Sequence, residues 1–219
     1  MNKAARLTTL DEQAIEYIAI GAAVLGTGGG GDPHVGKLIA MEAIRKHGPV
    51  RIVQLEELDD EGLVVPVSMI GAPTVMLEKI PSAEQLTKPL DLMERELGRK
   101  VDAVMPIEVG GGNSLVPVIA AAQRGIPLVD ADAMGRAFPE SQMVTFHLEG
   151  IPCSPVAMAD ERGNSALMHT IDGVWEERMA RALTVEMGGS ASICDYPVSG
   201  AQAKQSAIGG TLTLACEIG

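Results

Sequence analysis

Aromatic side chains are scarce in this sequence, since Phe, Trp and Tyr together make up 2% of its 219 residues. The chain is nevertheless 46% hydrophobic, so aliphatic side chains and its 12 Met must fill the core. Such a composition is suited to helices packed on a buried sheet. The length suffices for one sizeable core, or for one domain with the beginning of another.

Basic residues are also few: 17 Lys and Arg stand against 29 Asp and Glu, which gives a net charge of −12. Nucleic-acid binding requires clusters of Lys and Arg that neutralise phosphates, and the sequence lacks them. No apolar run is long enough to span a bilayer. Residues 1–6 lead into acidic residues rather than into the apolar core of a signal peptide. We therefore expect a cytoplasmic protein that binds neither nucleic acid nor a membrane.

Cysteine is limited to three widely spaced residues, Cys153, Cys194 and Cys216. An odd number with this spacing fits neither a disulfide framework nor a zinc-binding pattern. We interpret them as reduced thiols that pack as small hydrophobic side chains. Cys153 also has no neighbouring His in the sequence that would favour it as a nucleophile.

The most informative stretch is residues 107–114, Ile-Glu-Val-Gly-Gly-Gly-Asn-Ser. Residues 101–107 predict a short buried strand before the glycines, and residues 115–124 predict a helix after them. Glycines allow a sharp turn and the close approach of a ligand, and the free N–H groups of a helix N-terminus bind anions. The pattern indicates a small-molecule site with the carboxylate of Glu108 beside it.

A second glycine-rich segment, residues 26–33, has five glycines in its first six positions. It formally matches G-x-G-x-x-G, but the dinucleotide fingerprint requires a preceding strand, and here a predicted helix precedes it. No G-K-[ST] follows, so a nucleotide P-loop is unsupported as well. The segment is either a plain turn between two helices or a backbone surface that closes on a ligand. The candidate binding residues of both glycine segments are Gly28, Gly29, Gly30, Gly110, Gly111, Gly112 and Asn113.

The remaining pattern alternates predicted strands with predicted helices. Strands are predicted at residues 51–55, 63–70, 101–107 and 126–129, with strand-like pieces at 143–155 and 164–170 that favour a hairpin or an edge region. Polar residues follow several strand ends, and in parallel sheets ligands lie outside the carboxyl ends of strands. We therefore expect an α/β fold with a largely parallel sheet, in which the loops after residues 70, 107 and 129 converge.

The charged candidates each have two interpretations. Glu108 can act as a general base, or it can cap the following helix. Asp130 and Asp132 can act as an acid and an orienting group, or they can bind turn amides. Arg136 can hold a substrate carboxylate with its guanidinium fork, or it can pair with one of these aspartates. We take Glu108, Asp130 and Asp132 as candidate catalytic residues and Arg136 as a candidate substrate-binding residue.

A divalent metal is a separate possibility. Glu108, Asp130, Asp132 and His147 can in principle form an oxygen-rich or mixed site. No H-x-x-x-H pattern and no paired cysteines support it, and a histidine in a strand-like run is more often an ordinary interior or edge residue. We expect no cofactor, and the sequence does not decide whether a metal is used.

Five blocks, in order along the chain, carry a family resemblance. They are residues 25–33 (LGTGGGGDP), 71–75 (GAPTV), 106–117 (PIEVGGGNSLVP), 129–139 (VDADAMGRAFP) and 209–214 (GGTLTL). Together they resemble the S-methyl-thiohydantoin desulfurase family, and the resemblance covers essentially the whole chain. It implies a three-layer α/β domain, an α/β/α sandwich, followed by a smaller β-rich domain. It also implies a hydrolase that releases methanethiol from an S-methylated thiohydantoin to give a hydantoin, in catabolism of the thiohydantoin or ergothioneine type.

Members of that family normally continue well past the block at residues 209–214. We therefore expect residues 1–172 to form the α/β N-terminal domain and residues 173–219 to form a helical and strand extension on it. The β-rich C-terminal domain is then expected to be absent or truncated. The resemblance further implies a small cyclic-amide substrate, a hydantoin-like acid, and we expect a homo-oligomer.

Hydrolysis of such a ring requires an activated water, stabilisation of the ring nitrogen and oxygen, and a proton for the departing sulfur. Glu108 can activate the water, and the glycine loop with Asn113 can bind the ring oxygen. Two other classes of function stay open. One is a non-catalytic accessory or ligand-binding subunit of a hydantoinase or oxoprolinase system, and the other is a phosphate- or nucleotide-binding enzyme that uses residues 26–31.

Overall fold

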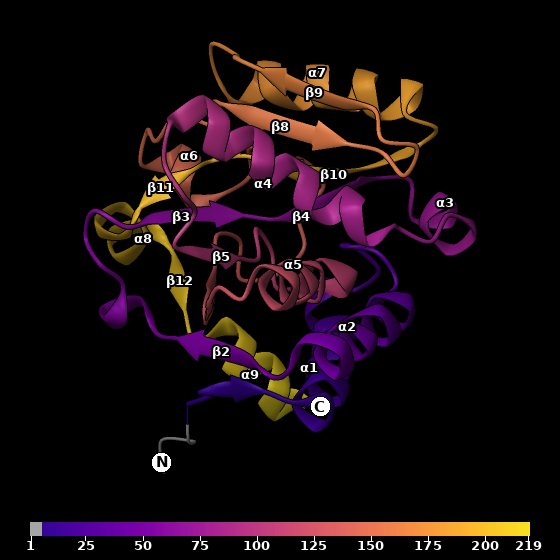
Figure 1. Cartoon of the computed structure of the whole chain (residues 1–219), viewed down its shortest axis with the longest axis vertical. Helices are drawn as coiled ribbons and strands as arrows, with labels where there is room; N and C mark the ends of the chain where they lie inside the picture. Colours follow the sequence, from indigo (N-terminus) through magenta and orange to yellow (C-terminus); the bar gives the residue numbers. More distant parts are fainter. Residues whose placement is uncertain (1–5) are drawn as a thin grey trace.

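The computed structural model describes residues 6–219 and is built around a six-stranded mixed sheet (Figure 1). The strand order is β1-β2-β6-β5-β3-β11. The four inner strands are parallel, whereas the two edge strands pair antiparallel. In sheet order the strands are β1 (Thr9–Leu10), β2 (Val50–Val53), β6 (Leu128–Val129), β5 (Ala103–Met105), β3 (Leu63–Pro66) and β11 (Val198–Ser199). The expected α/β fold with a largely parallel sheet is thereby confirmed.

Consecutive residues of the inner strands point into two different cores. On β3, Val65 belongs to the larger core, whereas Val64 belongs to a second core that also contains Phe146 and Ala203. This two-sided burial explains why the inner strands are almost continuously apolar. The larger core includes residues of α1 (Glu12–Gly26), α2 (Pro33–His47), α5 (Val116–Arg124) and α9 (Thr211–Ile218), and the second includes residues of α6 (Thr145–Leu148) and α8 (Gly200–Ser206).

A second, antiparallel sheet has the order β4-β10-β8-β9. Its sides are covered by two helices, α4 and α7 (Figure 1). On β8, Met158 belongs to the core shared with α7, whereas Ala157 belongs to the larger core that includes α4 residues. The elements are α4 (Ala83–Leu97), α7 (Gly173–Glu186), β4 (Ser68–Gly71), β10 (Ser190–Cys194), β8 (Val156–Ala159) and β9 (Ser165–Met168).

Two strand predictions differ from the structure. The apolar run 63–70 was predicted as one strand, but the chain leaves the main sheet at Val67, so that β3 and β4 lie in different sheets. Both pieces are buried, and an apolar run does not show which sheet each piece joins. The predicted strand at residues 143–155 is also wrong, because α6 lies there instead. A hairpin is present, formed by β8 and β9, but β8 begins only after the predicted piece at residues 143–155.

Three short helices and two short strands are the remaining elements of the described residues. A 3-10 helix at Leu55–Glu57 follows β2, and another at Gly111–Ser114 leads into α5. The short helix α3 (Pro73–Glu78) follows β4. After β6, β7 (Ala131–Asp132) pairs with β12 (Ile208–Gly209) in a separate two-stranded sheet.

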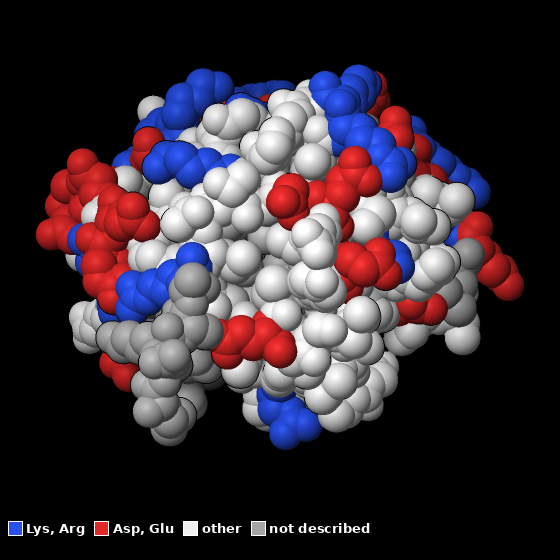
Figure 2. All heavy atoms as spheres, turned by 90° about the horizontal axis from the view of Figure 1, so that it is seen from below, with Lys and Arg blue, Asp and Glu red and all other residues white. Residues whose placement is uncertain are grey.

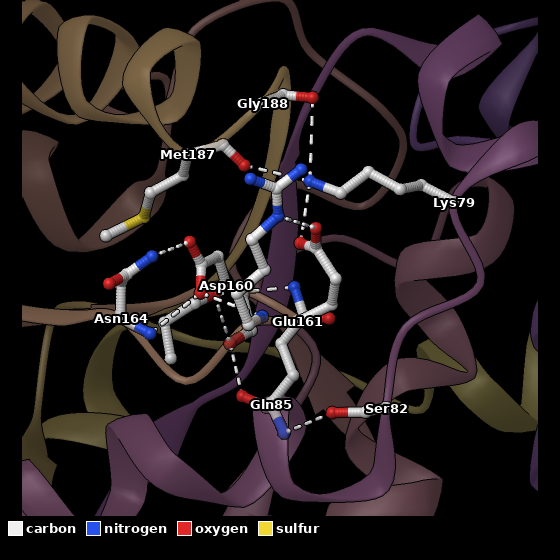
Figure 3. A network of polar contacts seen from close by, with 11 residues as sticks. Lys79, Ser82, Gln85, Asp160, Glu161, Asn164, Met187 and Gly188 are labelled. Carbon is white, nitrogen blue, oxygen red and sulfur yellow. Dashed lines mark hydrogen bonds and ion pairs between the residues drawn. The ribbon is translucent and has the colours of Figure 1, made fainter.

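Lys79 connects the segment between α3 and α4 to the second sheet (Figure 3). Its ammonium group donates to the backbone oxygen of Met187 at 2.8 Å and forms an ion pair with Glu161 at 2.6 Å. Asp160 accepts hydrogen bonds from the side chain and the N–H of Asn164, which closes the turn between β8 and β9. Because Met187 lies directly after α7, Lys79 supplies a positive charge to the C-terminal end of that helix.

The face that carries α1 and α9 combines a broad uncharged area with separate groups of charged side chains (Figure 2). Exposed large hydrophobic residues on these two helices are Tyr17, Ile20, Val24, Leu214 and Ile218. On this face the Lys and Arg side chains lie in several groups among Asp and Glu rather than in one continuous stripe.

Within residues 6–219, no helix combines the length and hydropathy that crossing a bilayer requires. Residues 1–5, which belong to the segment used in the signal-peptide argument, lie outside the described residues.

Candidate active site

The two glycine-rich segments pack against each other, backbone against backbone. The N–H groups of Gly112 and Asn113 donate to the carbonyl oxygens of Gly31 and Gly30, both at 3.0 Å. A Cβ on Gly30 would lie 2.0 Å from the carbonyl oxygen of Gly110, which no side chain tolerates. We expected the N–H groups of Gly112 and Asn113 to face a ligand, but they are used within the protein. Glycine is therefore needed in these segments so that the two backbones can approach each other this closely.

Glu108 lies after β5, beside the contact between the two loops. Its side chain is buried, and its Oε1 accepts a hydrogen bond from Nδ2 of Asn113 at 2.7 Å. The backbone N–H of Phe138 also donates to this carboxylate. Oε2 is buried and has no hydrogen-bond partner within the protein. Glu108 therefore does not cap the helix that follows it, which was the alternative interpretation of this residue.

The amide of Asn113 is fixed from two sides. Its Oδ1 accepts from the N–H of Met69 at 2.8 Å, and its Nδ2 donates to the carbonyl oxygen of Met69 at 3.1 Å. Because Met69 is in β4, this amide links the second sheet to Glu108. The two bonds to Met69 require Nδ2, and not Oδ1, to be the atom next to the carboxylate.

Burial raises the pKa of Glu108 to about 7, and the hydrogen bonds from Asn113 and Phe138 partly oppose this rise. A carboxyl group with a pKa near 7 can both accept and release a proton near neutral pH. The buried oxygen without a partner is available to hold that proton or to bind a ligand atom.

Asp132 supports the same loop. Its Oδ2 accepts from the N–H of Val109 at 2.7 Å and from that of Gly135 at 2.8 Å. Burial raises the pKa of Asp132 to about 7, and the nearby charge of Glu108 contributes to the rise. Since Val109 directly follows Glu108, Asp132 fixes the backbone that carries the candidate base.

A cavity of about 190 Å³ opens beside Glu108, between the main sheet and the second sheet. The segments after residues 70, 107 and 129 all reach it, as predicted, although β4 lies in the antiparallel second sheet and not in the parallel sheet that the strand-end argument assumed. Of the sequence-predicted site residues, Glu108, Asn113, Gly29 and Gly30 line it. The cavity is also lined by Ser141, Glu177, Arg181 and Asp195, none of which the sequence argument selected.

Comparison with known proteins decides the family. Residues 13–170 match the family described as S-Me-THD-like, N-terminal domain, and residues 171–219 match S-Me-THD-like, C-terminal domain. The chain belongs to the S-Me-THD-like family. A solved structure of a protein from Chromobacterium violaceum is similar, with a TM-score of 0.84 and 27% sequence identity, covering 97% of this chain. The chain spans 60% of that protein, and no curated protein matches it.

The match at residues 171–219 corrects one part of the expectation that the C-terminal domain would be absent or truncated, because that domain is not absent from this S-Me-THD-like chain. That part of the chain is not a separate body. Its strand β10 pairs with β4 and β8, and its strand β11 pairs with β3, so it contributes a strand to each of the two larger sheets. The sequence blocks did not show this, because strand pairing between distant segments leaves no local pattern.

Three predicted site residues lie away from the cavity. The carboxylate of Asp130 accepts from the N–H groups of Leu212 and Thr213 at 2.9 and 3.1 Å, at the start of α9. Arg136 is exposed, and its guanidinium lies 3.5 Å from the hydroxyl of Thr27. Gly28 has no atom within 4 Å of an added Cβ. Asp130 and Asp132 bind different parts of the protein because the chain passes from β6 to β7 between them.

The glycines of the second loop also do not line this cavity in the S-Me-THD-like chain. Gly110 and Gly111 pack against residues of the first glycine segment and Ala137, and Gly112 approaches Asp32. Their contribution to the site is therefore to hold Glu108 and Asn113 in place. Within residues 6–219, no group of three or more His, Cys, Asp and Glu is arranged to hold a metal ion.

Sequence patterns gave little indication that Glu177, Arg181 and Asp195 line the cavity. Glu177 and Arg181 lie on α7, where charged residues of an amphipathic helix are usually interpreted as a solvated face. Asp195 directly follows β10 and resembles Glu108 in that respect, since both are carboxylates after a buried strand. Strand-end position could have identified Asp195, whereas the inward position of Glu177 depends on how α7 packs.

Proposed function

We propose that this chain hydrolyses an S-methylated thiohydantoin, releases methanethiol and gives a hydantoin. The observation that carries the proposal is the carboxyl group of Glu108, which lines the cavity, has a pKa near 7 and has one buried oxygen without a partner. Membership of the S-Me-THD-like family supports the substrate class. A cavity of about 190 Å³ suits a single small ring.

In this proposal Glu108 is the general base. It removes a proton from a water molecule, whose oxygen forms a bond to the ring carbon that carries sulfur. The C–S bond then breaks, and the sulfur leaves with a proton as methanethiol. Asn113 and Asp132 are positioning residues, because one donates to the carboxylate of Glu108 and the other binds the N–H of the next residue.

Arg181 takes the role that the sequence suggested for Arg136. It lines the cavity, its Nη2 donates to the carbonyl oxygen of Pro139 at 2.8 Å, and it is paired with Glu177. A guanidinium held in this way can bind a carboxylate on the substrate ring, such as a propionate side chain, with its remaining N–H groups.

The test is methanethiol release from S-methyl-thiohydantoin propionate. Glu108→Gln keeps the shape of the side chain and removes the base, so we expect a loss of about 10²- to 10⁴-fold in rate. Glu149→Gln, at an exposed glutamate, is the matched control and should release thiol as the wild type does. A folded wild-type chain that releases no thiol, or a Glu108→Gln variant as fast as the wild type, would contradict the proposal.

The two other classes of function receive less support. A nucleotide or phosphate site in the first glycine segment receives less support because the close contact of Gly26 and Gly30 with the second loop already explains why these positions are glycine. A ligand-binding subunit without catalysis would not need a carboxyl group with a pKa near 7. Binding of a hydantoin acid without turnover would nevertheless identify that function in the assay above.

A further inference from the structure

A second carboxyl group lines the same cavity and comes from the end of a strand in the second sheet. Asp195 directly follows β10 and lines the cavity together with Glu108. Its side chain is 2% exposed, and its Oδ1 is buried without a hydrogen-bond partner. A buried carboxylate oxygen without a partner is costly, whereas a protonated carboxyl group at a cavity can donate to a ligand.

The surroundings of Asp195 favour the protonated form. From α7 it faces Glu176 and Glu177, and Cys153, Cys194 and Tyr196 are the other titratable groups around it. Of the cations close to this cluster, Arg181 is paired with Glu177, and Arg124, which acts on Cys194, is paired with Asp91. Burial therefore holds the pKa of Asp195 well above its usual range, and the charge of Glu176 adds to the rise.

Glu176 has a different position from Asp195. It accepts a hydrogen bond from the hydroxyl of Ser141, its Oε1 has no partner, and it does not line the cavity. Burial raises the pKa of Glu176 to about 7. Glu177 lines the cavity but is bound to the N–H of Ser141 and to Arg181. Asp195 is thus the carboxyl group of this cluster that both reaches the cavity and has an unused oxygen.

We propose that Asp195 is the acid that protonates the departing sulfur, in the cavity that Glu108 also lines. This inference rests on the proposed function. The proton on the Asp195 carboxyl group passes to the methanethiolate sulfur as the C–S bond breaks, while Glu108 retains the proton taken from water. The second proton of the water moves from the new hydroxyl group to the ring nitrogen, which converts the lactim to the hydantoin. Transfer of the proton on Glu108 back to Asp195 through solvent restores both groups, so that water and substrate give hydantoin and methanethiol.

The experiment compares two leaving groups on the same ring. S-Methyl substrate expels a basic thiolate and needs a proton, whereas S-(4-nitrophenyl) substrate expels a weakly basic thiolate and does not. For Asp195→Asn we expect a loss of about 10²-fold or more with the S-methyl substrate and of less than about tenfold with the S-(4-nitrophenyl) substrate. Glu108→Gln should slow both substrates alike, since both need the water to be activated.

The ratio of the two rates is measured on one protein sample, so a partly unfolded Asp195→Asn sample does not distort it. Equal losses with both substrates would overturn the role of Asp195 and leave that of Glu108 intact.

A second readout is the infrared difference spectrum between wild type and Asp195→Asn at neutral pH, which should contain the carbonyl stretch of a protonated carboxylic acid. The absence of that band would also overturn the inference. No turnover of either substrate by the wild type would instead overturn the proposed function, and with it the role of Asp195.

Discussion

Nδ2 of Asn113 donates to Oε1 of Glu108 at 2.7 Å, while the same amide binds both the N–H and the carbonyl oxygen of Met69. Glu108 comes from the loop after the parallel strand β5, and Met69 comes from the antiparallel second sheet. The candidate base is therefore held where the two sheets meet. The bond from Asn113 also lowers the pKa of Glu108 relative to burial alone.

The first prediction concerns this amide. Asn113→Ala removes the partners of both polar groups of Met69, which are buried, so the free energy of unfolding should fall by about 2 to 4 kcal/mol. Without the donor, the pKa of Glu108 should rise. The rising part of the plot of kcat/KM against pH should therefore move to higher pH. Asn164→Ala, which removes a bond at the far end of the second sheet, is the control. If both variants lose stability and neither moves this rising part, Asn113 has only a structural role.

The second prediction separates the two reasons for glycine in the first loop. Gly28 and Gly30 both have positive φ angles, 97° and 74°, but only Gly30 has no room for a Cβ. Gly28→Ala should cost about 1 kcal/mol, the penalty of a left-handed backbone. Gly30→Ala should cost more than about 2 kcal/mol, because two backbones must also separate. Equal losses in urea denaturation would show that the loops do not interlock in solution.

The third prediction follows from the raised pKa of Glu108. Folding moves this pKa from 4.5 to about 7, so the folded protein binds the proton more tightly than the unfolded chain. The contribution of Glu108 to the free energy of unfolding therefore falls as the pH rises from about 4.5 to about 7, and stays constant above that.

Glu108→Gln removes this penalty. At pH 8 the variant should be more stable than the wild type by up to about 3 kcal/mol, and the gain should disappear near pH 4. Groups with lowered pKa values, such as Glu94 and Glu161, are present in both proteins and cancel in the difference. Chemical denaturation at pH 4 and pH 8 measures the difference in the free energy of unfolding between variant and wild type. A difference that does not change with pH would show that Glu108 has an ordinary pKa.

The fourth prediction concerns Arg181. If its guanidinium binds the substrate carboxylate, Arg181→Gln should raise KM for the propionate substrate by about tenfold to a hundredfold. KM for the corresponding carboxamide should change little. Arg178→Gln is the control on the same helix, since Arg178 lies over the ring of Trp175, 5.4 Å from its centre. Equal changes in KM for acid and amide would assign Arg181 a structural role.

Local sequence pattern predicted the elements around the site well. The strand before Glu108, the glycine turn and the helix after it are all present, because apolar periodicity and glycine position report local structure directly. The position of Glu108 at a cavity followed from the general placement of ligands at strand ends. The division of the chain into an α/β domain at residues 1–172 and an extension on it at residues 173–219 stays a prediction.

The rest of the site depends on contacts between distant segments. That Gly30 packs on Gly110 and that Asn113 binds Met69 results from chain packing, which glycine content alone did not reveal. Asp130 and Asp132 were expected to act together because they are two residues apart. The pairing of β7 with β12 brings the start of α9 to Asp130, whose carboxylate binds its first N–H groups.

The measurement that tests the central claim most directly is the pH dependence of kcat/KM for thiol release, in the wild type and in Glu108→Gln. If Glu108 is the base, kcat/KM of the wild type should rise with pH and level off with an apparent pKa near 7, since the carboxylate form is active. The residual rate of Glu108→Gln should lack this limb. A wild-type profile without a limb between pH 5 and 9, or a limb that persists unchanged in Glu108→Gln, would contradict the account.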